Sequence, residues 1–178
     1  EQAAARKQAQ ASSDRWMRGA TLGLLDGIPA TLKELIATKG QPVPLGTKAV
    51  ELQPATEDAP AAARLREDGA VLFAKTTCPD YGMLSSGLSS FHPLSRNPWD
   101  TTQNPGGSSA GASAAAAAGY GPLHIGTDIG GSVRLPAGWT GIFGFKPSHG
   151  RIPIDPFYVG RCAGPMTRTV EDAAHAMA

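Results

Sequence analysis

The stretch PGGSSAGASAAAAAGYGPLHIGTDIGGSVRLP, residues 105–136, decides the fold of this chain. Two serines, Ser108 and Ser132, each follow a pair of glycines near its two ends, and they are 24 residues apart. That separation allows a short helix, a turn and a strand that returns the second serine towards the first. Glycine lets the backbone approach a ligand closely, and successive free N–H groups form a concave site for an anion. Such a site suits the oxyanion of an acyl-transfer reaction.

Helix and strand patterns around this stretch predict an α/β fold. Residues 109–118 can only be a helix of very small side chains, and residues 123–126 are expected to form a strand. Residues 140–145 supply another small-residue strand or a packed turn. Upstream, we expect a short helix over residues 58–68 and a buried strand over residues 70–75, because the latter is a continuous apolar run. A helix followed directly by a buried strand is typical of layered α/β architecture.

The two ends of the chain are also expected to be helical. Residues 1–18 are polar and rich in alanine, and Thr169 followed by Asp172 resembles a capping box at the start of a last helix. An apolar, strand-like run is expected through Leu25. Residues 146–164 contain several prolines and are expected to form a loop.

The composition argues against several classes of function. Sixteen basic and 15 acidic residues give a net charge of +1, which offers no field for nucleic acid or an anionic membrane. No run of about 18 apolar residues is present, and the beginning of the sequence lacks the pattern of a signal peptide. Cys78 and Cys162 are far apart, which favours free thiols in a reducing compartment. We therefore expect a cytoplasmic protein without a membrane or nucleic-acid partner.

Three interpretations of the serines stay open on the residues alone. Residues 107–111 fit the G-x-S-x-G elbow of hydrolases with Ser109 at its centre, although the preceding residues make a poor strand. A phosphate-binding loop is the second interpretation, but no Gly-Lys-Ser/Thr follows. In the third, Ser132 is the nucleophile, Ser108 a relay and Lys33 the base. Against all three, paired Gly-Gly-Ser segments also occur as ordinary turns.

Lys33 is the one charged residue on the apolar face of residues 30–36. A lysine there can keep its ammonium group in water while its stem packs on the apolar surface. Alternatively it is buried, and desolvation lowers the pKa of its ammonium group until a neutral amine is available as a base. The lysine alone does not decide between the two.

The chain resembles the amidase signature family along almost its whole length. The resemblance is carried, in order, by LLDGIPATLKELIATKG (24–40), EDAPAAARLREDGAVLFAKT (57–76), RNPWDTTQNPGGSSAGASAAAAAG (96–119), GTDIGGSVRLPAGWTGIFGFKPSHGRIP (126–153) and GPMTRTVEDAA (164–174). It implies an amidase signature fold, a mixed β-sheet core flanked by helices. It also implies an amidase that hydrolyses a carbon–nitrogen bond through an acyl-enzyme.

The resemblance also assigns roles to individual residues. Ser132 matches the nucleophile, Ser108 the serine that follows a cis peptide bond, and Lys33 the catalytic lysine. The remaining matches are to the oxyanion hole, formed by the backbone amides of Ile129, Gly130, Gly131 and Ser132, and to residues that hold the loop and the triad in place, namely Ser109, Asp128 and Arg134. Glu34 departs from the family pattern, since an aspartate commonly follows the lysine.

Expectations about ligands and completeness follow from the same resemblance. We expect no cofactor and no metal, a small-molecule amide as substrate, and a homodimer as an open option. Family members are longer, so residues 1–178 are expected to be one amidase signature domain that is incomplete at both ends. Two alternatives remain: the catalytic subunit of a glutamine-dependent aminoacyl-tRNA amidotransferase, and a non-catalytic homologue or interaction fragment.

Overall fold

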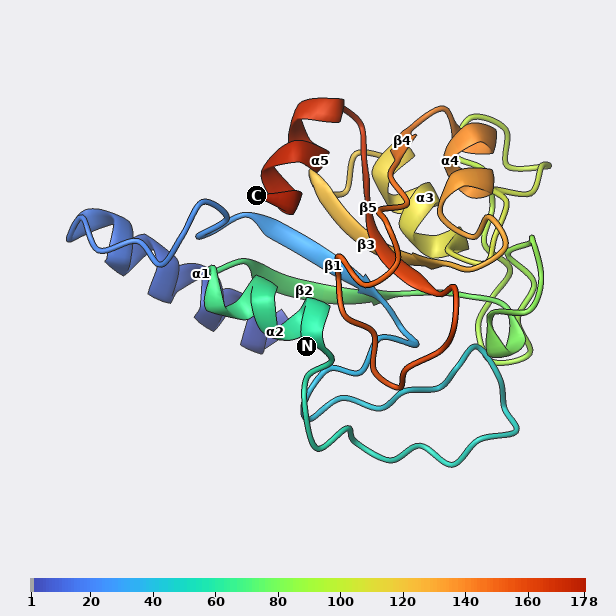
Figure 1. The fold of residues 1–178 in the computed structure, drawn as a ribbon, viewed down its shortest axis with the longest axis horizontal. Helices are drawn as coiled ribbons and strands as arrows, with labels where there is room; N and C mark the ends of the chain where they lie inside the picture. Colours follow the sequence, from blue (N-terminus) through green and yellow to red (C-terminus); the bar gives the residue numbers. More distant parts are fainter. Residues whose placement is uncertain (1) are drawn as a thin grey trace.

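A computed structural model describes residues 2–178, which form a five-stranded mixed sheet flanked by helices (Figure 1). The order of the strands across the sheet is β2-β1-β3-β5-β4. The strands are β1 (Pro29–Lys33), β2 (Val71–Thr76), β3 (Leu123–Asp128), β4 (Phe143–Gly144) and β5 (Cys162–Thr167). The helices are α1 (Gln2–Met17), α2 (Pro60–Glu67), α3 (Ala110–Ala117), α4 (Arg134–Thr140) and α5 (Val170–Met177), with a 3-10 turn η1 (Asp80–Gly82). The α/β fold with a mixed sheet is therefore confirmed.

The directions of the strands bring several chain segments to one edge of the sheet. β1 is parallel to both β2 and β3, so the last residues of β1 and β3, Lys33 and Asp128, lie at the same edge. β5 is antiparallel to β3 and pairs Cys162 with Asp128, so β5 begins at this edge. In open α/β sheets ligands bind beyond the carboxyl ends of the parallel strands.

Hydrophobic side chains form two clusters, and the alternation of side chains along β3 separates them. Leu123 and Ile125 pack in a cluster that includes Leu65 of α2. The second cluster contains Ala112 of α3, Val133, Ala137 of α4, and Met166 of β5. Successive strand residues point to opposite faces, so α2 and α3 cover different faces of the sheet.

The small side chains of α3 allow it to approach the sheet closely. α3 packs against β1, β2, β3 and β5, and it lies beside α4 in Figure 1. A Cβ atom added to Gly126 of β3 would lie 2.7 Å from Ser109 Oγ and 2.8 Å from Met166 Sδ. Gly126 is therefore the residue that permits Ser109 to contact the sheet backbone.

Most of the predicted elements are confirmed. The helices expected over residues 58–68 and 109–118 correspond to α2 and α3, and the strands expected over residues 70–75 and 123–126 to β2 and β3. α1 is present as expected, although residue 1 lies outside the described residues. Thr169 caps α5, since its hydroxyl oxygen accepts a hydrogen bond from the Asp172 amide at 3.1 Å.

The strand-like run expected through Leu25 is wrong, because this segment forms turns. The amide of Leu22 donates to Asp26 Oδ2 at 2.8 Å, and the amide of Leu25 donates to Asp68 Oδ2 at 2.7 Å. Side-chain carboxylates thus take the backbone donors that a sheet ladder would need.

The loop expected over residues 146–164 extends too far, because β5 already begins at Cys162. Gly164 and Pro165 argue against a strand in the sequence, yet Pro165 lies opposite Ile125 in the ladder. Proline keeps its carbonyl, and here that oxygen accepts a hydrogen bond from the Phe145 amide at 3.0 Å.

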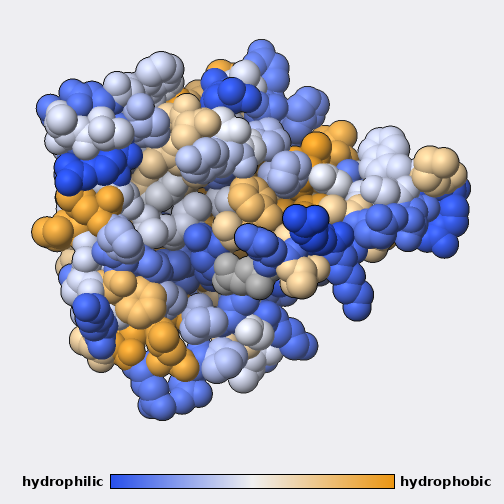
Figure 2. Space-filling view, turned by 180° about the vertical axis from the view of Figure 1, so that it is seen from behind, coloured by the Kyte–Doolittle hydropathy of each residue, from blue (hydrophilic) through white to orange (hydrophobic). Residues whose placement is uncertain are grey.

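The surface carries both hydrophilic areas and separate hydrophobic patches (Figure 2). The C-terminal end of α1 projects from the body of the molecule, and Trp16 and Met17 are exposed there. Within residues 2–178, no helix combines the length and the apolar character needed to cross a membrane.

Candidate active site

Lys33 lies at the centre of the candidate site, and its side chain is completely buried. Its Nζ donates a hydrogen bond to Ser108 Oγ at 2.7 Å and another to Thr127 Oγ1 at 3.1 Å. The interpretation in which the ammonium group stays in water is therefore wrong. Lys33 and Ser108 come from distant segments of the sequence, and the sheet edge brings them together.

Burial lowers the pKa of Lys33 to about 7, because the charged ammonium form loses its hydration. The positive charge of Arg161 lowers it further, whereas the carboxylates of Asp128 and Glu34 oppose this effect. Burial raises the pKa of the neighbouring Cys78 thiol, so this group stays neutral and places no charge beside the lysine. A substantial fraction of Lys33 is therefore a neutral amine near pH 7.

Ser108 and Ser109 lie at the start of α3, where the backbone turns sharply. The peptide bond between Gly107 and Ser108 is cis, as the family resemblance implies. Ser109 is fully buried, and its hydroxyl donates to the Thr127 carbonyl and accepts from the Thr127 amide, both at 3.2 Å. This hydroxyl is engaged by the backbone of β3, which argues against the elbow interpretation with Ser109 as nucleophile.

Ser132 lies in the turn between β3 and α4 and is half-buried. Its carbonyl oxygen accepts a hydrogen bond from the Ser109 amide at 3.2 Å, so the two Gly-Gly-Ser turns are adjacent. Within residues 2–178, the Ser132 hydroxyl forms no hydrogen bond. The relay contact between the hydroxyls of Ser132 and Ser108 stays a prediction.

Asp128 organises the turn that carries Ser132. Its carboxylate accepts hydrogen bonds from the amides of Gly131 at 2.9 Å and Val133 at 3.0 Å, and from Arg134 Nε and Nη2 at 3.0 and 2.9 Å. Burial raises the pKa of Asp128, but the hydrogen bonds from Arg134 and the backbone outweigh it and bring the pKa to about 2. Asp128 is thus a carboxylate at neutral pH, and the structure brings it together with Arg134 as expected.

The predicted oxyanion-hole residues do not share one environment. Gly131 has a positive φ of 116°, and its amide is already donated to Asp128. Ile129 and Gly130 are exposed, and within residues 2–178 their amides donate no hydrogen bond. The available donors in this turn are therefore the amides of Ile129 and Gly130, while Gly131 provides the bend.

Sequence reasoning missed two features of the site. Thr127 accepts a hydrogen bond from Lys33, and no spacing rule marks this threonine at the end of a strand. Glu34 is buried, and its carboxylate accepts from the Cys78 amide at 3.0 Å and lies 2.5 Å from His92 Nε2. Glu34 therefore fixes the long loop after β2 beside the lysine, although only its departure from the family pattern marked it.

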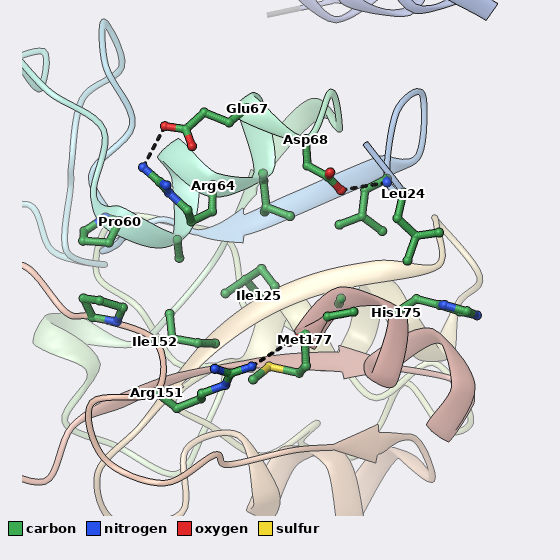
Figure 3. Close-up of a pocket in the computed structure, with 16 residues that line it drawn as sticks. Leu24, Pro60, Arg64, Glu67, Asp68, Ile125, Arg151, Ile152, His175 and Met177 are labelled. Carbon is green, nitrogen blue, oxygen red and sulfur yellow. Dashed lines mark hydrogen bonds and ion pairs between the residues drawn. The ribbon is translucent and has the colours of Figure 1, made fainter. Parts of the chain in front are cut away.

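The largest cavity lies elsewhere. A cavity of about 540 Å³ opens between α2, β3 and α5, and Figure 3 shows the Arg64–Glu67 ion pair and the hydrogen bond from Arg151 to Met177 at its wall. Neither Lys33 nor a serine lines it. No group of three or more His, Cys, Asp or Glu side chains within residues 2–178 is placed to hold a metal ion.

Comparison with known proteins identifies the family. The family model described as Amidase matches residues 2–178. The chain belongs to the amidase signature family. Among curated relatives, a glutamyl-tRNA(Gln) amidotransferase subunit from Roseiflexus sp. (strain RS-1) is 44% identical to this amidase chain over 174 residues, and the match covers 96% of this chain and 36% of the relative. The amidase chain thus spans about a third of the length of that relative.

Solved structures support the same assignment. A crystal structure of an amidase is 42% identical, with a TM-score of 0.91, and the match covers 99% of this chain and 42% of that one. The peptide amidase from Stenotrophomonas maltophilia is 34% identical, with a TM-score of 0.89, covering 97% of this chain and 37% of that one. The amidase signature fold is therefore confirmed, and this chain corresponds to part of it.

Proposed function

We propose that the whole protein is an amidase that hydrolyses a linear carbon–nitrogen amide bond through an acyl-enzyme on Ser132. The observation that carries the proposal is the 2.7 Å hydrogen bond between the buried Lys33 amine and the Ser108 hydroxyl. Family members act on amides, as the names of the amidase and peptide amidase structures state. A buried amine joined to a serine is a proton acceptor for nucleophilic catalysis without histidine.

The proposed reaction moves one proton along this pair in each direction. Neutral Lys33 accepts the proton of Ser108, and Ser108 accepts the proton of Ser132 as the Ser132 oxygen bonds to the amide carbon. The tetrahedral intermediate then collapses, the carbon–nitrogen bond breaks, and the same proton returns through Ser108 to the leaving nitrogen. Water repeats the attack on the acyl group and releases the acid.

The turn after β3 would stabilise the negative oxygen of the intermediate. The amides of Ile129 and Gly130 are directed by a turn whose shape the Asp128 carboxylate fixes. Preorganised backbone donors cost no reorganisation when the oxyanion forms. No metal or cofactor has a role in this scheme.

The test is ammonia release from a panel of primary amides by the whole protein. Ser132→Ala and Lys33→Ala should each lose at least about 1,000-fold in kcat/KM, because members of a nucleophile–base unit fail together. Ser113→Ala is the matched control, since its hydroxyl is buried in α3 and donates only to carbonyl oxygens of Pro105 and Ala110. Full activity in either of the first two variants would overturn the proposal.

A second candidate is the catalytic subunit of a glutamine-dependent aminoacyl-tRNA amidotransferase. The curated relatives from Roseiflexus and Chloroflexus, at 44% and 41% identity, are named as subunits of a glutamyl-tRNA(Gln) amidotransferase. The proposed triad would serve that function equally well, so activity on simple amides does not separate the two. Glutaminase activity together with co-purification of partner subunits would favour the amidotransferase.

We propose the cytoplasm as the location and a small amide as the substrate. Cys78 and Cys162 are both buried free thiols, which fits a reducing compartment. The name of the curated relatives refers to a tRNA, so the expectation of no nucleic-acid partner applies to the stand-alone amidase and stays a prediction. The homodimer likewise stays a prediction, and size-exclusion chromatography with light scattering would test it.

A further inference from the structure

Arg161 lies at the edge of the sheet that carries the candidate active site. It directly precedes Cys162, the first residue of β5, which pairs with Asp128 at the end of β3. The preceding Gly160 is close to Ile129, whose Cγ1 is 3.8 Å from the position that a Cβ would take on that glycine. Arg161 therefore lies beside the turn whose amides would hold the acyl carbonyl oxygen.

The guanidinium group of Arg161 is partly buried without a partner. Within residues 2–178, it forms no ion pair and no side-chain hydrogen bond, whereas the arginines in the ion pairs are Arg15, Arg64, Arg66 and Arg134. Burial lowers the pKa of Arg161, which records the loss of hydration around its charge. A charge that is partly removed from water and left unpaired is costly, so a ligand of opposite charge would stabilise it.

Arg161 is also near the proposed relay. It lines a small cavity together with Thr127 and Leu35, and Thr127 accepts a hydrogen bond from Lys33. The cavity has a volume of only about 10 Å³, so a substrate would meet the guanidinium group from its half-exposed side. The positive charge of Arg161 acts on Lys33, which places the two groups within electrostatic range.

We propose that Arg161 binds a carboxylate on the acyl part of the substrate, so that the protein prefers amides of dicarboxylic acids over neutral amides. This inference rests on the proposed amidase function. A guanidinium group presents a planar pair of donors that matches a carboxylate. The other residues around it are mostly apolar, namely Leu35, Ile36, Pro153, Ile154 and Ala163, which suits a single carboxylate on a short chain better than a phosphate with more acceptors to satisfy.

Asp155 is the acidic side chain that lines the same cavity. It forms no ion pair with Arg161 within residues 2–178, so it does not neutralise the guanidinium group. Its charge would oppose a substrate carboxylate at short range. Asp155→Asn is therefore expected to tighten the binding of an acidic substrate, provided that Arg161 is the group that binds it.

The experiment compares succinamate with 4-methylpentanamide, in which an isopropyl group replaces the carboxylate at the same chain length. kcat/KM is measured for the whole protein at pH 9, where Lys33 is neutral in every variant. Arg161→Gln should lower kcat/KM for succinamate about 10- to 100-fold, mainly through KM, as expected for the loss of hydrogen bonds to a charged group. The same variant should leave 4-methylpentanamide within about 3-fold of the wild type.

Arg168→Gln is the matched control, because Arg168 is exposed and directly follows the other end of β5. A second measurement needs no turnover: succinamate should slow the labelling of Ser132 by a fluorophosphonate in the wild type, and not in Arg161→Gln. Equal losses on both substrates, or no protection of Ser132 by succinamate in the wild type, would overturn the assignment of Arg161. If the wild type is not labelled on Ser132 at all, the proposed amidase function itself fails, which separates the two outcomes.

Discussion

Labelling of Ser132 should switch on as the pH rises through 7, because only the neutral form of Lys33 accepts a proton. Burial brings the pKa of this lysine down to about 7 from its ordinary value of 10.5. Its side chain is completely buried, and its two partners are hydroxyl groups, which place no counter-charge on the ammonium. The sign follows from the role: a base is active when deprotonated, so the rate is high above the pKa and falls below it.

The size of the effect follows from the titration of a single group. With a pKa of about 7, the neutral fraction is about 1% at pH 5 and about 90% at pH 8, so the rate should rise about 90-fold and then level off. With the ordinary lysine pKa, the rate would still climb about tenfold per pH unit beyond pH 8.5. The shape of the curve therefore reports the pKa of Lys33 directly.

The assay follows the rate at which a fluorophosphonate labels Ser132 in the whole protein between pH 5 and pH 10. Lys33→Arg provides the control, since arginine keeps the positive charge and stays protonated throughout this range. That variant should label at least about 100-fold more slowly than the wild type at pH 8. A rate that keeps rising above pH 8.5, or an Arg variant with an unchanged profile, would refute the reasoning.

Three further substitutions probe the groups around the lysine. Asp128→Asn removes an acceptor for the backbone of the nucleophile turn and for Arg134, and it should lower the free energy of unfolding by about 2–4 kcal/mol in urea denaturation; a loss below about 0.5 kcal/mol would contradict this. Gly126→Ala places a methyl group within 3 Å of Ser109 and should cost about 1–3 kcal/mol in the same measurement, whereas an unchanged midpoint would show that the helix can shift. Thr127→Val removes one acceptor of the Lys33 amine and should slow Ser132 labelling about 10-fold at pH 8 with about 1 kcal/mol of lost stability, and an unchanged rate would exclude a role in positioning the amine.

The sequence predicted the elements that depend on strong local patterns. The small-residue helix before β3 and the buried strand after α2 both have patterns that few other structures accept. The pairing of Lys33 with Ser108 was predicted by family resemblance, and the structure joins them at 2.7 Å. Local patterns alone left the role of Lys33 open, because burial of a lysine is a property of the assembled sheet.

Features that depend on contacts between distant segments could not be predicted. β5 contains Gly164 and Pro165, and it forms a strand only because β3 supplies the neighbouring ladder. Thr127 meets Lys33 across 94 residues of sequence, and Glu34 meets His92 across 58. No periodicity or motif encodes such pairs, so they emerge only when the sheet edge is assembled.

The most direct test of the central claim is to map the residue that a fluorophosphonate modifies, by mass spectrometry of peptides from the whole protein. The proposed relay predicts a single adduct on Ser132 that is lost in Lys33→Ala and retained in Ser113→Ala. An adduct on Ser109, or an adduct on Ser132 that persists at an unchanged rate without Lys33, would contradict the claim that the buried lysine activates Ser132.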